Sequence, residues 1–217
     1  MFYRLMTAHL VADFVLQTRW LVQRKHTPGG LALHIAILGL AIAAVTADRL
    51  AEWWPWLLAI LVAHAVVDWA KVRLQPRLRV APILLFLADQ AAHILSIVAV
   101  IALADLNGLR AGEAEPLWWL VCAYLTATFG LSIALPLWLD PPNLMKRPAA
   151  ARLTLIAASA LVLTLAWRGL PILIPVVGVA MYRGIALPLG RRPATATLPI
   201  EFWSAAVVAA ILGWGLT

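Results

Sequence analysis

Long apolar runs alternate with short polar stretches along this chain of 217 residues. Each run has about 20 mostly apolar residues, the length at which an α-helix crosses the roughly 30 Å hydrocarbon core of a bilayer. The pattern predicts helices over residues 1–22, 30–47, 53–72, 82–104, 117–139, 148–167, 169–190 and 199–216. Prolines and glycines stand at the joints, for example within residues 28–30 and 140–143. We therefore expect an all-α fold, a polytopic transmembrane helical bundle of about eight spans.

The composition supports a membrane protein and excludes an ordinary soluble domain. Hydrophobic residues make up 64% of the chain and charged residues 12%, with a mean hydropathy of +0.91. A typical soluble domain has about 45–50% apolar and about 25% charged residues. The single cysteine, Cys122, excludes a disulfide within the chain. We expect one integral membrane domain over residues 1–217.

Basic residues are distributed unevenly between the two sides of the predicted helices. The chain has 17 Lys and Arg residues and a formal net charge of +7. Thirteen of the 17 lie on one side, and the other side has Arg4, Arg49, Arg110 and Arg168. Because loops rich in Lys and Arg stay in the cytoplasm, the pattern predicts a bacterial inner-membrane protein with both termini on the outer side. The net positive charge is then explained by the orientation of the helices in the membrane. We therefore expect no nucleic-acid partner.

Ionisable residues interrupt the first four apolar runs at regular places. Each run has one histidine, and these are His9, His34, His64 and His93. Three acids each have a histidine four residues away, in the pairs His9/Asp13, His64/Asp68 and Asp89/His93. Residues four apart share one face of a helix. We therefore expect each pair to point in a single direction.

Two of these stretches are nearly identical and indicate a duplication. Residues 8–14 have the pattern Ala-His-x-Val-x-Asp-Phe, and residues 63–69 have Ala-His-x-Val-x-Asp-Trp. His-Ile at 34–35 likewise corresponds to His-Ile at 93–94. The first four helices therefore resemble two copies of one helical hairpin, related by a pseudo-two-fold axis along the membrane normal. Asp89 has no counterpart in the first copy, where Gly30 stands.

The polar set is expected to form one layer in the inner half of the bilayer, open to the cytoplasm. At a rise of about 1.5 Å per residue, its members lie roughly 5–17 Å from the inner helix ends, with His9 slightly deeper. Three more polar residues accompany it. Gln17 continues the first helix face by one turn, Lys71 continues the third, and Gln90 stands next to Asp89.

A divalent metal site explains this residue set. One charge at the bilayer centre costs about 2.5–3.5 kcal/mol, so these groups must face each other, water or an ion. Neutral imidazole together with carboxylate suits Zn, Fe or Mn. The expected ligands are His9, Asp13, His34, His64, Asp68 and His93. We expect Asp89 to act as a further ligand or a general base, with Gln90 and Lys71 orienting ligands or polarising a substrate.

The leading hypothesis is a metal-dependent hydrolase of a lipid-borne ester or phosphoester, with membrane lipid and an amphiphilic small molecule as partners. A proton- or cation-coupled transporter would use Asp13, Asp68 and Asp89 as carriers. A structural polar network between the helices is another alternative, and haem ligation by facing histidines is a further one. The helices are almost purely apolar beyond His9 and His93, which favours the enzyme over the transporter.

The same residues resemble the bacterial membrane family named domain of unknown function 3307. The family pattern is His-Leu-x-Ala-Asp-Phe-x-x-Gln, a later His, then His-x-x-x-Asp-x-x-Lys and Asp-Gln-x-x-His. This chain shows it from His9 to His93, and the resemblance covers about residues 5–97. It implies a membrane protein in which the polar set is one unit, and it implies no established activity.

The second half of the chain carries fewer chemical signals. Residues 1–104 are expected to form the core with the histidines and acids, and residues 117–217 an apolar four-helix scaffold. Longer members of the resembled family have Glu-Arg and Glu-Tyr in this half, where this chain has Ala151-Arg152 and Glu201-Phe202. We expect Glu201 to form an ion pair with Arg183.

Overall fold

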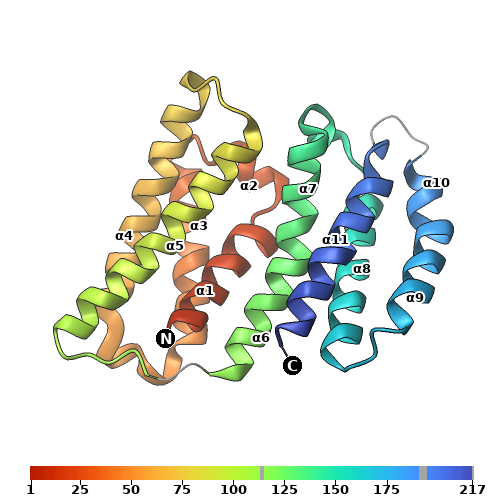
Figure 1. The fold of residues 1–217 in the computed structure, drawn as a ribbon. Helices are drawn as coiled ribbons and strands as arrows, with labels where there is room; N and C mark the ends of the chain where they lie inside the picture. The colour runs from red at the N-terminus through yellow and green to blue at the C-terminus, as the bar shows by residue number, and fades with distance from the viewer. Residues whose placement is uncertain (113–114, 191–194, 217) are drawn as a thin grey trace. The chain divides into compact units, whose positions relative to one another are not determined.

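The computed structural model describes residues 1–112, 115–190 and 195–216. Every regular element among these residues is helical, and none is a strand, which confirms the all-α prediction (Figure 1). The chain divides into two compact units, Met1–Cys122 and Ala123–Thr217. The single membrane domain expected over residues 1–217 stays a prediction.

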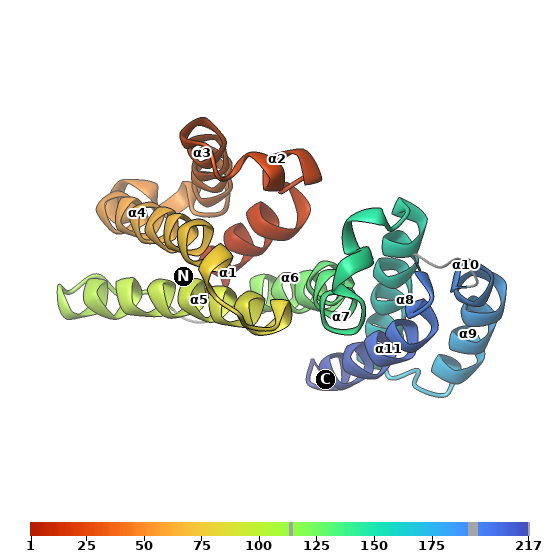
Figure 2. The same cartoon turned by 90° about the horizontal axis from the view of Figure 1, so that it is seen from above.

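The first unit contains the helices that bear the predicted polar set. Its α-helices are α1 Phe2–Leu10, α2 Arg19–Arg24, α3 Pro28–Val45, α4 Leu50–Leu74, α5 Pro82–Leu106 and most of α6 Pro116–Leu125. A π-helical turn, Val11–Val15, follows α1, and 3₁₀ turns lie at Ala47–Arg49 and Gln75–Arg77. Four of the elements form a closed ring, in which α1 and α4 each contact both α3 and α5 (Figures 1 and 2).

The ring encloses its histidines and exposes apolar side chains on its outer surface. On its outer surface Leu40 is 73% exposed, Val66 57% and Leu95 66%. The histidines of the same three helices, α3, α4 and α5, are buried in the interior. Exposing so much apolar surface to water is unfavourable at roughly 25 cal/mol per Å². This arrangement is therefore typical of helices surrounded by lipid.

Five helical segments of the described residues are long and apolar enough to cross a membrane. They are Pro28–Val45, Ala47–Arg77, Pro82–Leu106, Pro116–Leu139 and Ala149–Trp167. The C-terminal helix Leu198–Trp214 is apolar but shorter. These segments support a membrane protein, and the expected number of eight spans stays a prediction.

The expected continuous helix over residues 1–22 is wrong. The π-helical turn closes with a 2.9 Å hydrogen bond from the Leu16 amide to the Val11 carbonyl, and the helix then ends. The Thr18 hydroxyl accepts a 3.3 Å hydrogen bond from the Leu21 amide and so caps α2 as a new helix. Gln17 consequently lies in the connection between the two helices rather than on the face of His9 and Asp13.

The connection from α2 to α3 depends on a glycine. A Cβ atom at Gly30 would lie 2.0 Å from the Arg24 carbonyl oxygen, and only glycine tolerates that approach. The Gly30 amide donates a 3.1 Å hydrogen bond to the Thr27 hydroxyl, which caps α3. The end of α2 is thus held close to the first turn of α3.

The second unit is built around one close helix pair, α8 and α11. Its elements are the π-helical turn Thr126–Gly130, α7 Leu131–Leu139, the 3₁₀ turn Pro141–Lys146, α8 Ala149–Trp167, α9 Leu173–Met181, the π-helical turn Tyr182–Ala186, α10 Leu187–Gly190 and α11 Leu198–Trp214. A Cβ atom at Gly213 of α11 would lie 2.6 Å from the Cβ atom of Ala166 on α8. Small residues therefore allow the two helices to approach closely.

The expected ion pair of Glu201 with Arg183 is wrong. Glu201 is fully buried and accepts hydrogen bonds of 2.5 and 2.6 Å from the Arg147 guanidinium. Arg183 is exposed. Because Arg147 stands just before α8 and Glu201 lies in the first turn of α11, the close packing of α8 and α11 brings the two residues together.

Adding a methyl group at Gly30 should destabilise the first unit, since either α2 or α3 must move. We expect Gly30→Ala to lower the free energy of unfolding by about 1–3 kcal/mol, the usual cost of overpacking. Gly29→Ala is the matched control, because a Cβ atom there meets nothing within 4 Å. Thermal unfolding in detergent measures both. Equal stability of the two variants would contradict the close approach of α2 to α3.

Candidate metal centre

The predicted histidines and acids gather in the interior of the four-helix ring. They come from α1 and the turn after it, α3, α4 and α5. Each is at most 6% exposed, and they are His9, Asp13, His34, His64, Asp68, Asp89 and His93. The expectation that these residues form one cluster is therefore confirmed.

The three pairs with i,i+4 spacing share helix faces as expected. The shortest nitrogen–oxygen distances are 3.9 Å for His9 and Asp13, 3.4 Å for His64 and Asp68, and 3.5 Å for Asp89 and His93. Asp13 belongs to the π-helical turn after α1. Such turns are rare and occur frequently at functional sites.

Two carboxylate oxygens of this cluster lie close to the same two histidine nitrogens. We call these four atoms the first donor set: His34 Nε2, His64 Nε2, Asp13 Oδ1 and Asp68 Oδ2. The two histidine nitrogens are 3.0 Å apart. Asp13 Oδ1 lies 3.1 and 3.5 Å from them, and Asp68 Oδ2 lies 3.3 and 3.4 Å from them. All five distances therefore fall between 3.0 and 3.5 Å.

Three of these five distances lie in the range of a tetrahedral metal site, and the other two are slightly shorter. With metal–ligand bonds of about 2.0–2.2 Å, tetrahedral ligand atoms lie about 3.3–3.6 Å from each other. Hydrogen bonds explain the set less well, because ionised carboxylates only accept and each neutral imidazole has one proton. Either Nε2 atom faces three potential acceptors and has at most one proton to share among them. The donor set fits a divalent cation.

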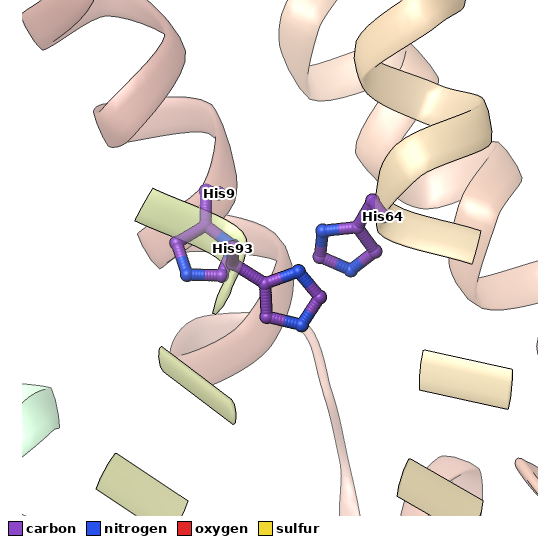
Figure 3. A group of neighbouring side chains, drawn as sticks. All are labelled: His9, His64 and His93. Atoms are coloured by element: carbon purple, nitrogen blue, oxygen red, sulfur yellow. The ribbon is translucent and has the colours of Figure 1, made fainter. Parts of the chain in front are cut away.

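The rings of three histidines, His9, His64 and His93, lie against one another (Figure 3). The rings of His64 and His93 are stacked with centroids 3.9 Å apart, and the His9 ring is 5.0 Å from His93 and 5.5 Å from His64. One nitrogen from each ring lies within 4.8 Å of the other two. A further group of ligating atoms within 4.8 Å of one another comes from Asp13, Asp89 and His93.

The two residues expected to flank Asp89 both contact its carboxylate. Lys71 Nζ lies 2.6 Å and Gln90 Nε2 3.1 Å from Asp89 Oδ2, and both donate hydrogen bonds to it. Gln90 Oε1 lies 3.2 Å from His9 Nε2. This chain of contacts orients Asp89 and His9 from outside the cluster, as groups around metal ligands commonly do.

Lys25 belongs to the site, and the sequence reasoning missed it. Its Nζ atom lies 2.8 Å from Asp68 Oδ2. A helix continuous to residue 22 would carry Lys25 away from the cluster, and the break before Thr18 brings it back. The capping pattern at Thr18 and Thr27 is the sequence signal for that break. Gln17, in contrast, takes part in none of the cluster's hydrogen bonds or ion pairs in the described part of the chain.

The charges of the cluster do not balance without a further cation. Three carboxylates, Asp13, Asp68 and Asp89, face two ammonium groups, Lys25 and Lys71. One negative charge remains in a buried place, where an unpaired charge is costly. A divalent ion or a protonated histidine compensates it.

One opening reaches the cluster at Asp89, and a second reaches Lys25, which contacts Asp68. A cavity of about 170 Å³ between α4 and α5 is lined by Lys71 and Asp89. A groove of about 770 Å³ between α3 and α4 has Lys25, His26 and Arg73 at one end and Gly39 and apolar residues along its length.

The sequence model of the family described as protein of unknown function (DUF3307) matches residues 1–120. This is more than half of the chain, so the chain belongs to that family. The match contains every residue of the cluster and ends close to the end of the first compact unit. No curated protein and no solved structure matches the chain.

The single substitution of Lys25 should destabilise the protein more than a double substitution that removes both Lys25 and its partner Asp68. Lys25→Met leaves the buried Asp68 carboxylate short of one cation, and loss of one partner of a buried pair costs about 3–5 kcal/mol. We expect Lys25→Met/Asp68→Asn to recover most of this loss, and the exposed Arg24→Met to change little. Chemical unfolding of the metal-free protein, in detergent with a chelator, measures all three without a contribution from metal binding. An unchanged stability of Lys25→Met would contradict the ion pair.

Proposed function

We propose that this member of the DUF3307 family is a metal-dependent membrane hydrolase that acts on a lipid-like substrate. The observation that carries the proposal is the first donor set. Its five distances, 3.0–3.5 Å, are close to those between ligands of one divalent ion, and its residues come from the turn after α1, from α3 and from α4. Zn, Fe and Mn all accept imidazole and carboxylate ligands.

The residues around the donor set would have different roles in the reaction. An ion bound there would supply a water molecule with a lowered pKa for the attack on an ester or phosphoester. Asp13, His34, His64 and Asp68 would hold the ion, and the water would be a fifth ligand, a coordination number that catalytic Zn sites can reach. Lys25 would orient Asp68 through its contact with Oδ2. Asp89 would take the proton of the attacking water. Lys71, whose side chain is 34% exposed at the small cavity, is placed to stabilise negative charge on the substrate.

The groove between α3 and α4 supports an amphiphilic substrate. It runs along the apolar surface of two helices that are long enough to cross a membrane. Its basic end includes Lys25, which also contacts Asp68. A lipid with its acyl chain in this groove would have its headgroup next to the cluster. An anionic headgroup would be favoured by Lys25 and Arg73.

The interior of the ring favours an enzyme over a transporter. A proton- or cation-coupled transporter needs polar access to its carrier residues from both sides of the membrane. Towards the ends of α3 and α5 at Val45 and Leu106, the space beyond the histidines is filled by buried apolar side chains. These include Leu38, Ile42, Trp53, Leu57, Ile60, Ile97 and Val100. The polar groups that reach an opening, Lys71 and Asp89, lie towards the other end.

The proposed setting is the inner membrane of a bacterium, with the cluster facing the cytoplasm and both termini outside. The basic residues near the cluster end of the ring support this orientation, because the loop at residues 73–79 has three arginines.

Metal analysis tests the centre. We expect near-stoichiometric Zn, Fe or Mn in the purified wild type by elemental mass spectrometry, and loss of it in Asp13→Ala/Asp68→Ala. The exposed Asp105→Ala is the control and should keep the metal. A wild type that stays free of metal after supplementation would overturn the proposal.

A lipid assay tests the activity. Purified protein in phospholipid vesicles should hydrolyse an ester-linked or phosphoester-linked lipid, and Asp89→Asn should lower the rate at least about 100-fold, as for loss of a general base. Asn107→Ala, an exposed substitution at the far end of α5, should leave the rate unchanged. Equal rates of the wild type and Asp89→Asn would remove Asp89 from the reaction.

A further inference from the structure

We propose that a second divalent ion binds beside the first, so that Asp13 and Asp68 bridge a two-metal centre suited to phosphate esters of lipids. This inference rests on the proposed function and deepens it. Its second donor set is centred on Asp13, Asp89 and His93, which have ligating atoms within 4.8 Å of one another. His9 Nδ1, 3.9 Å from Asp13 Oδ2, and Asp68 Oδ1, 3.8 Å from His93 Nε2, complete it.

Both shared carboxylates present their two oxygens to different histidines. Asp13 Oδ1 lies 3.1 Å from His34 Nε2, while its Oδ2 lies 3.9 Å from His9 Nδ1. Asp68 Oδ2 lies 3.3 Å from His34 Nε2, while its Oδ1 lies 3.8 Å from His93 Nε2. A carboxylate that bridges two metal ions uses its oxygens in this way. Ions in two-metal sites lie about 3.5–4 Å apart.

The hydrogen bonds of Gln90 determine which ring nitrogen of His9 bears the proton. Because the Asp89 carboxylate only accepts hydrogen bonds, Gln90 must direct its NH₂ group to Asp89 and its oxygen to His9. His9 Nε2 therefore donates to Gln90 and bears the proton. In the neutral ring Nδ1 then has a lone pair, and this lone pair faces Asp13 Oδ2. Two acceptors face each other there, as they do around a cation.

His93 and Asp89 provide the other ligands. His93 is 1% exposed, and neither of its ring nitrogens has a hydrogen-bond partner among the described residues. Its Nε2 atom lies 3.5 Å from Asp89 Oδ1, which also has no partner there. Lys71 and Gln90 occupy only Asp89 Oδ2. His93 Nε2 and Asp89 Oδ1 are thus buried atoms without a hydrogen-bond partner among the described residues, and both are available to bind an ion.

The charge of a two-metal centre indicates its substrate. The cluster alone has one excess negative charge, because three carboxylates face two lysines. One divalent ion reverses this to one positive charge, which a hydroxide neutralises. Two divalent ions give three positive charges, which a hydroxide and a phosphomonoester dianion neutralise together. Lipid phosphomonoesters therefore fit the two-metal centre better than neutral carboxylic esters do.

The reaction is hydrolysis and needs only water as the second reactant. The oxygen of water forms a bond to phosphorus, and the bond from phosphorus to the lipid oxygen breaks. The lipid oxygen leaves with a proton and becomes an alcohol, and inorganic phosphate is released. In this two-metal form Asp89 is a ligand, so the proton reaches the leaving oxygen from Lys71 or water at the small cavity.

Counting bound Mn²⁺ tests the second ion. The purified apoprotein is titrated with Mn²⁺, and bound metal per chain and the electron paramagnetic resonance spectrum are measured. We expect two ions with a spin-coupled spectrum in the wild type, and one uncoupled ion in Asp89→Asn and in His93→Ala. Asp89→Asn keeps the shape of the side chain and guards against misfolding. His26→Ala, an exposed histidine outside the cluster, should keep two ions.

The outcomes separate this inference from the proposed function. One ion in the wild type that is lost in His34→Ala but kept in Asp89→Asn would overturn the second site and leave the hydrolase proposal standing. No bound ion at all would overturn both.

A substrate comparison tests the phosphate preference. Phosphatidylcholine vesicles that contain either phosphatidic acid or diacylglycerol are incubated with the Mn²⁺-loaded wild type. We expect phosphate release from phosphatidic acid, at least about 10-fold faster than fatty-acid release from either lipid, and its loss in His93→Ala. Fatty-acid release without phosphate release would overturn the phosphate preference while supporting a lipid hydrolase.

Discussion

The structure depends on the need to compensate three carboxylates buried inside a ring of apolar helices. Asp13, Asp68 and Asp89 are each at most 6% exposed, in a protein whose outer surface is largely apolar. A buried charge without a partner costs several kcal/mol, so each carboxylate must have a cation or a hydrogen-bond donor close to it. Lys25 and Lys71 supply two positive charges, and the four histidines of the ring supply the remaining polar contacts. A divalent ion with a bound hydroxide would complete this balance without requiring a charged histidine.

Several features of the fold follow from that constraint. The helix that begins the chain ends early at a π-helical turn, and α2 turns back so that Lys25 reaches Asp68. Gly30 has no side chain where the Arg24 carbonyl approaches α3, which leaves room for that return. Lys71 and Gln90 hold Asp89 from outside the cluster. The carboxylates of the cluster are thus held by residues around them, as a preorganised metal site requires.

The sequence predicted the helices and the cluster well, because both depend on local periodicity. The length of the apolar runs indicated α3, α4, α5 and α8 within a few residues, and i,i+4 spacing showed which histidines and acids share a face. The break after Val15 was missed because a π-helical turn leaves the apolar pattern intact. Lys25 and the partner of Glu201 were missed because their contacts depend on how distant elements pack. Nothing in the local pattern distinguishes Arg147 from Arg183.

The most direct test of the account is anomalous diffraction from crystals of the protein, recorded at the Zn, Fe and Mn absorption edges. The account predicts an anomalous peak about 2.1 Å from the Nε2 atoms of both His34 and His64, the usual length of a metal–imidazole bond. A map without an anomalous peak, in which the two Nε2 atoms stay 3.0 Å apart and share a proton, would contradict it. The cluster would then be a hydrogen-bonded network that joins the four helices.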